Sequence, residues 1–109
     1  MSYQHKELAS GRWNTFSFFS QMANIGSEVL RAVRWRSIDK NNSRLAAERA
    51  LELVDLTIDD PKNHTSGRLK ELWRLREFVA DYFFFGNEYN STPELWRHYF
   101  DAFAYAANR

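Results

Sequence analysis

Apolar residues recur at spacings of three and four along almost the whole chain, and this periodicity constrains the fold more than any other feature. Within residues 10–37, two neighbouring apolar stripes predict a long first helix with a broad buried face. A polar stripe from Asn14 to Arg31 follows the opposite side of the same helix. The apolar–polar alternation of a half-buried strand is absent from the sequence, and so are internal repeats. We therefore expect an all-α protein.

Three more helices follow from the same periodicity and from the residues that start and stop helices. The second covers Ser43–Asp60, with Ser43 as its N-cap and proline directly after it. The third covers residues 68–85 and ends at Gly86, where a C-terminal glycine cap belongs. The fourth begins at Thr92, an N-cap followed by a proline at the first helical position.

The connections between these segments are short, which favours antiparallel neighbours. We predict one domain, residues 1–109, folded as an antiparallel up-down-up-down four-helix bundle with a long first helix. At 1.5 Å per residue, that first helix would be about 42 Å long, far longer than the others. Its excess would protrude, bend near Gly11 or Gly26, or pack on another subunit.

The residues that the chain lacks exclude several classes of protein. With no cysteine there is no disulfide, no thiolate zinc site and no cysteine nucleophile, and this agrees with a reducing compartment. No apolar run approaches the roughly 20 residues that span a bilayer, and the polar residues 1–8 are not a signal peptide. We expect a cytoplasmic protein that does not enter a membrane.

Aromatic residues make up 17% of the chain, and arginine outnumbers lysine eleven to four. Aromatics first fill the core of a small bundle, but Trp, Tyr and Arg are also the residue types enriched at interfaces. The run "DYFFF" has three consecutive phenylalanines about 100° apart, so their rings cannot all face one core. The candidates for an interface are Trp13, Phe16, Trp73, Phe84, Phe85, Tyr89 and Trp96.

Charge alternates in sign along the chain: basic through residue 47, acidic over 48–60, basic over 61–76 and acidic afterwards. We expect adjacent corners of the bundle to pair their charges, with association between subunits as the alternative. Arg76 falls on the apolar row of the third helix, so if that row is buried we expect Arg76 to need a carboxylate partner, with Glu28 as the candidate. The stretch "RAVRWRSIDK" interleaves arginines with a tryptophan, a combination that suits phosphate contacts and base stacking. The candidates for an anion or nucleic-acid surface are Arg31, Arg34, Trp35, Arg36, Lys40 and Arg44.

Catalytic or metal-binding patterns are weak. Glu94, His98 and Asp101 share one face of the fourth helix and are candidate metal ligands. Bundle di-metal sites need Glu-x-x-His on two helices, and this sequence has none. No serine has a recognisable base, and no glycine-rich phosphate loop occurs. We therefore predict no catalytic residue and no cofactor, with a metal-binding or hydrolytic bundle as a remote alternative.

Four segments carry a resemblance that covers nearly the whole chain: "QMANIGSEVLRAVRW", "ERALELVDLTIDDPKN", "RLKELWRLREFVADYFF" and "NEYNSTPELWRHYFDAFAYAA". In these segments the chain resembles a group of uncharacterised bacterial and archaeal four-helix-bundle proteins. It is similar, more distantly, to the small bundles encoded by ribosomal-RNA intervening sequences, which self-associate. The resemblance implies the fold, a prokaryotic cytoplasm and oligomerisation, and it carries over no catalytic residue.

From these observations we predict a non-enzymatic bundle that associates with itself or with a protein partner. The alternative is a nucleic-acid-binding accessory protein that uses the corner Arg31–Lys40.

Overall fold

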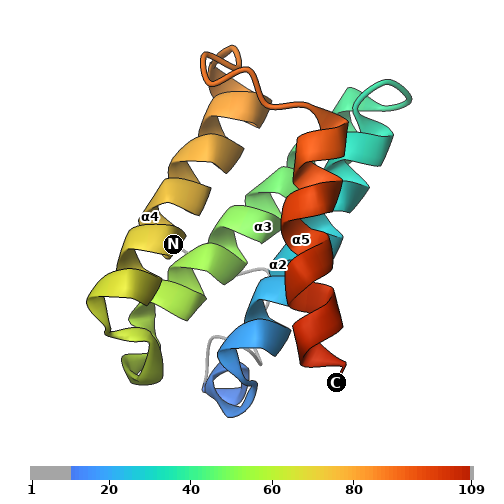
Figure 1. The fold of residues 1–109 in the computed structure, drawn as a ribbon. Helices are drawn as coiled ribbons and strands as arrows, with labels where there is room; N and C mark the ends of the chain where they lie inside the picture. Colours follow the sequence, from blue (N-terminus) through green and yellow to red (C-terminus); the bar gives the residue numbers. More distant parts are fainter. Residues whose placement is uncertain (1–10, 109) are drawn as a thin grey trace.

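We describe residues 11–108 of a computed structural model of the chain (Figure 1). All regular elements in this range are helical, and no strand occurs between residues 11 and 108. Four α-helices form the body: α2 (Phe18–Trp35), α3 (Lys40–Asp59), α4 (Ser66–Ala80) and α5 (Pro93–Ala107). The short helical turns are the 3₁₀ turns η1 (Arg12–Thr15) and η2 (Pro61–Asn63) and the π-helical turn η3 (Asp81–Phe85).

Helix α2 packs against both α3 and α5, and α3 packs against α4. The loops after α2 and after α4 lie at the upper end of Figure 1, and the α3–α4 connection lies at the lower end. Helices α4 and α5 follow each other in sequence but are not in comparable contact. The prediction of an all-helical protein with four packed helices is confirmed. On the side between α4 and α5, however, the helices do not pack closely against each other.

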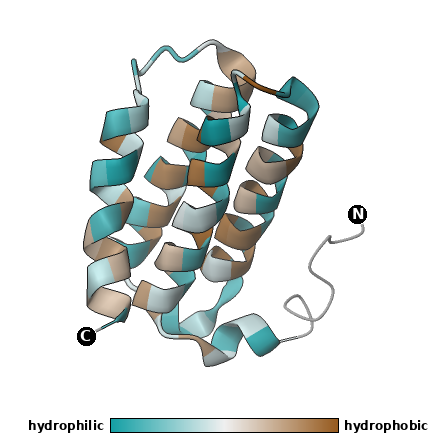
Figure 2. Cartoon of the chain, turned by 90° about the vertical axis from the view of Figure 1, so that its right-hand side faces the viewer, coloured by the Kyte–Doolittle hydropathy of each residue, from teal (hydrophilic) through white to brown (hydrophobic). Residues whose placement is uncertain are grey.

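The core follows from the helical periodicity. Buried residues of α2 recur every three or four positions, including Met22, Ile25 and Val29, and they meet Val54 of α3 and Leu72 of α4. Figure 2 shows hydrophobic residues recurring along the helices with hydrophilic residues between them. A smaller cluster of alanines lies between α2 and α3 near their connection: Ala32, Ala46 and Ala47. Each helix therefore has one apolar side, and these sides share one interior.

The first α-helix is shorter than the sequence predicted. It begins at Phe18 and has 18 residues, whereas α3 has 20, and Ser10 lies outside the described residues. The reason is local. Ser17 is an N-cap whose hydroxyl accepts a hydrogen bond from Ser20 N–H at 3.1 Å. Before it, the 3₁₀ turn η1 bends the chain so that Trp13 enters the core.

Of the predicted capping residues, two are confirmed and one is wrong. Thr92 caps α5 by accepting a hydrogen bond from Leu95 N–H, and Gly86 ends η3 in the left-handed region at φ 100°. Ser43 is not the N-cap of α3, because Asp39 caps it through the N–H groups of residues 41 and 42. Ser43 lies one turn inside the helix, where its buried hydroxyl donates to Ala32 O at 2.7 Å.

A buried polar network joins η1 and α2 to the end of α3. The Gln21 amide donates to Trp13 O at 3.1 Å and to Asp60 Oδ2 at 2.8 Å, and it accepts from Asn63 at 2.9 Å. The Trp13 indole donates to Thr57 Oγ1 at 2.9 Å. Each buried polar side chain of this network therefore has a hydrogen-bond partner, as is usual because an unpaired buried polar group costs free energy. The network fixes the lower end of the molecule.

Candidate functional site

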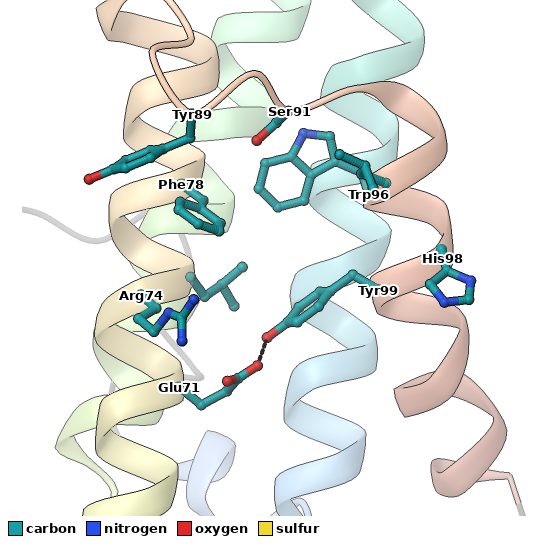
Figure 3. Close-up of a pocket in the computed structure, with 10 residues that line it drawn as sticks. Glu71, Arg74, Phe78, Tyr89, Ser91, Trp96, His98 and Tyr99 are labelled. Carbon is teal, nitrogen blue, oxygen red and sulfur yellow. Dashed lines mark hydrogen bonds between the residues drawn. The ribbon is translucent and has the colours of Figure 1, made fainter.

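A groove of about 410 Å³ opens between α4 and α5, on the side where these helices are not packed together. Its apolar walls come from α4 (Leu75, Phe78), from the connecting loop (Tyr89) and from α5 (Leu95, Trp96, Tyr99). Glu71, Arg74, Ser91 and His98 supply its polar groups. Figure 3 shows Trp96 and Tyr99 directed from α5 toward the side chains of α4, with Tyr89 lying over the α4 side.

Trp96 is a buried part of the groove wall, with 4% of its surface exposed. Its ring packs against Tyr82 (centroids 5.8 Å apart) and Phe100 (6.1 Å). Its Nε1–H is buried and has no hydrogen-bond partner among residues 11–108. Figure 3 shows the nitrogen-bearing edge of the indole toward the loop that carries Ser91. A buried donor without an acceptor costs roughly 1–3 kcal/mol.

Tyr99 bridges the groove from α5 to α4. Its hydroxyl donates a hydrogen bond to Glu71 Oε1, drawn as the dashed line in Figure 3. Burial and the neighbouring Glu71 carboxylate both raise the pKa of Tyr99 well above its ordinary value, because each disfavours a phenolate. This bond is the polar link that holds α4 and α5 at their observed separation.

The loop between η3 and α5 places Tyr89 over the groove. The buried carboxylate of Asp81 accepts hydrogen bonds from Glu88 N–H at 2.7 Å and Tyr89 N–H at 3.1 Å. The Asn87 side chain closes the rest of the turn, donating to Ser91 O and accepting from Ser91 N–H. The Tyr89 ring then lies 4.7 Å from that of Phe78, centroid to centroid. The loop is therefore shaped by internal hydrogen bonds and forms one wall of the groove.

The aromatic interface candidates divide into core and surface residues. Trp13 and Trp96 are buried in the core of the chain, so neither is itself exposed to a partner, and Phe16 packs partly buried against Trp13. The exposed candidates are Trp73 (52%), Tyr89 (54%) and Phe85 (74%). Of these, only Tyr89 lines the groove.

The three phenylalanines of "DYFFF" lie on η3, and their side chains have different surroundings. Phe83 packs partly buried against the main core, and both Phe83 and Phe84 pack against the alanine cluster of α2 and α3. Phe85 remains exposed. The π-helical turn therefore directs two of the rings onto the body of the protein and leaves the third outside.

The candidate metal ligands Glu94, His98 and Asp101 are all exposed on α5. Glu94 lies 3.9 Å from Arg97 in a solvent-exposed pair. Between residues 11 and 108, no group of three His, Asp or Glu side chains is arranged to hold a metal ion.

Several charged residues of the predicted anion surface already have partners. Glu28 pairs with Arg31 and with Arg49, each at 3.2 Å. Arg76, which we expected to need a carboxylate, pairs with Asp55 at 2.8 Å and not with Glu28. Arg44, near the start of α3, pairs with Glu48 at 3.1 Å. The remaining candidates lie at the end of α2 and the start of α3: Arg34, Trp35, Arg36 and Lys40. Among the described residues, no ion pair neutralises the positive charge of Arg34, Arg36 or Lys40.

Sequence reasoning found Tyr89 and Trp96 of the groove but missed Glu71, Phe78 and Tyr99. These three fit the ordinary amphipathic pattern of their helices, which gives no sign that two neighbouring helices stand apart.

Comparison with protein-family models, with curated proteins and with solved structures finds no match to this chain. The resemblance to four-helix-bundle proteins therefore stays a prediction. None of the helices between residues 11 and 108 combines the length and hydropathy that crossing a membrane would require.

Proposed function

We propose that this chain is a non-enzymatic, antiparallel up-down-up-down four-helix module that self-associates through the α4/α5 groove. The observation that carries the proposal is the groove itself, which is lined by aromatic rings and exposes Tyr89 and Leu95 at its opening. The positions of the loops in Figure 1 support the up-down arrangement.

Apolar exposure at the groove supports association. Tyr89 and Leu95 are 54% and 58% exposed, and both line the opening. Covering them removes apolar surface from water, worth roughly 25 cal/mol per Å² before the costs of association.

A second copy fits this groove because the groove carries both signs of charge. Glu71 and Arg74 lie three residues apart on α4, and both line the opening. In a twofold-symmetric dimer the same patch meets itself, so Arg74 of one copy can lie opposite Glu71 of the other. A patch of one sign would repel its own copy, and this one does not.

Light scattering coupled to gel filtration tests the proposal. We expect wild type at micromolar concentration to show twice the 13.0 kDa chain mass. Leu95→Glu should shift the protein toward the monomer, because the groove wall then carries a carboxylate. The change favours folding, because Leu95 N–H is the donor to the Thr92 cap, and glutamate at this position completes a capping box.

Trp73→Ser is the matched control. It removes an exposed aromatic ring from α4 that does not line the groove, so the dimer should persist. A strictly monomeric wild type refutes the proposal. Equal dissociation of the Leu95→Glu and Trp73→Ser variants also refutes it, because the contact would then not be specific to the groove.

A further inference from the structure

A second pocket, of about 620 Å³, lies where the end of α2, the start of α3 and η3 meet. Its lining residues are Arg36, Lys40, Ser43, Arg44, Phe83 and Phe84. All the ionisable residues among them are cations, and the two phenylalanines provide an aromatic surface beside those cations. This corner is separate from the α4/α5 groove, with which it shares no lining residue.

Arg36 is held in place by rings and not by an acid. Its guanidinium carbon lies 4.3 Å from the centroid of the Tyr82 ring and 5.8 Å from that of Phe83. These cation–π contacts orient the guanidinium while leaving its N–H groups unused by a carboxylate. Among the described residues, no ion pair involves Arg36 or Lys40. Both charges are therefore available to an anion.

The acids near this corner only partly offset its positive charge. Arg44 pairs with Glu48 at 3.1 Å, but the Arg44 side chain is 71% exposed, so the pair contributes little and can exchange for a stronger anion. The Asp39 carboxylate is occupied as the cap of α3, where it accepts from the N–H groups of residues 41 and 42. Three cations thus face a pocket that no acid from the described part of the chain lines.

The aromatic part of the pocket has a firm base. Phe84 and Phe83 are partly buried against Ala32, Ala46 and Ala47, which are themselves fully buried. The Ser43 hydroxyl donates its hydrogen bond to Ala32 O, so Ser43 lines the pocket without a free donor. Ring faces fixed in this way can stack against a flat ligand, and stacking of a base on an aromatic side chain contributes roughly 1–3 kcal/mol.

We propose that this corner binds a nucleotide unit, with the phosphate among Arg36, Lys40 and Arg44 and the base against Phe83 and Phe84. A simple inorganic anion would use the cations but not the rings, and an uncharged aromatic molecule would use the rings but not the cations. The pocket volume lies within the range of pockets that bind small molecules. The same unit occurs in free nucleotides and in single-stranded nucleic acid. The proposal does not depend on self-association through the groove.

Fluorescence anisotropy with a fluorescein-labelled oligothymidylate tests the site across a range of salt concentrations. We expect binding at low salt, and we expect the double variant Arg36→Gln/Lys40→Gln to weaken it. The slope of log affinity against log salt should fall by roughly 0.7 for each cation removed. Phe84→Leu should weaken binding roughly tenfold with a smaller change of slope, because it removes stacking and not charge. Circular dichroism confirms that each variant is folded.

The control variant is Lys70→Gln/Arg97→Gln, which removes two exposed cations outside the corner and should leave affinity nearly unchanged. Competition with AMP identifies the source of the ligand. Displacement by AMP supports a free nucleotide, and binding of the oligonucleotide without displacement by AMP supports single-stranded nucleic acid.

Three results overturn the proposal. The first is that neither the oligonucleotide nor AMP binds at low salt. The second is that the control variant weakens binding as much as the corner variant does, since the attraction would then be non-specific. The third is that inorganic phosphate displaces the oligonucleotide as well as AMP does, because the rings would then play no part.

Discussion

Gly26 of α2 allows α5 to approach closely, and replacing it tests the packing of these two helices. A Cβ placed on Gly26 would lie 2.7 Å from Phe100 Cδ1 and Cγ and 2.9 Å from its Cβ. Favourable carbon–carbon contacts lie at about 3.5–4.0 Å, so the overlap approaches 1 Å. The atoms involved include the root of the Phe100 side chain, which moves only if α5 moves. Gly26→Ala therefore forces α2 and α5 apart.

The magnitude is a balance of two opposing effects. Overpacking a core typically costs about 1–3 kcal/mol, while alanine in place of glycine inside a helix returns up to about 1 kcal/mol. We expect a net loss of roughly 1–2 kcal/mol. In a domain of about 100 residues, this lowers the melting temperature by roughly 4–15 °C.

Gly67→Ala provides the matched control, because the same substitution in α4 meets no atom within 4 Å. Without overlap, only the higher helix propensity of alanine over glycine remains. The control should therefore be more stable than wild type by about 0.5–1 kcal/mol. Thermal and urea denaturation measure both variants. If Gly26→Ala is as stable as Gly67→Ala, the close approach of Phe100 does not limit the packing and the reasoning fails. Combining Gly26→Ala with Phe100→Leu should recover part of the loss.

Two further predictions concern pH. Burial alone would raise the pKa of Asp60, but hydrogen bonds from Lys62 and Gln21 outweigh it and lower the pKa. Its stabilisation is therefore complete above the unfolded pKa of about 3.9 and is lost as pH falls below it, so urea denaturation should show acid destabilisation that Asp60→Asn reduces. An unchanged acid profile in that variant would contradict the prediction. The pKa of Tyr99 is raised, so its contribution is complete below the unfolded pKa of about 10 and is lost as pH rises above it. Tyr99→Phe should flatten the fall in melting temperature between about pH 9 and 11, and an equal fall in the variant would count against the bridge to Glu71.

Local signals predicted the helices well because their causes are local. Thr92 and Gly86 act at α5 and η3 as their residue types indicate, since a hydroxyl cap and a positive φ depend only on neighbouring backbone. The prediction for Ser43 failed because Asp39, four residues earlier, satisfies the first N–H groups of α3. Both residue types are good caps, and the sequence offered no criterion to choose between them.

Partners across the fold could not be predicted in the same way. The carboxylate beside Arg76 is Asp55, and the one expected there, Glu28, instead binds Arg31 and Arg49. Which acid meets which base depends on the rotation of each helix about its own axis. Helical periodicity gives the direction of a face but not the facing residue on another helix.

The sequence by itself determined that this chain is helical, where most of the helices start and stop, and which side of each is apolar. These properties follow from hydrogen bonds and side-chain spacing within a few residues. Only the tertiary structure decided that α4 and α5 stand apart, that Trp96 keeps a buried N–H without an acceptor, and that Arg36 rests on Tyr82 beside a cationic pocket. Those features depend on distances between segments that are separate in sequence, and such distances are fixed only when all the helices pack together.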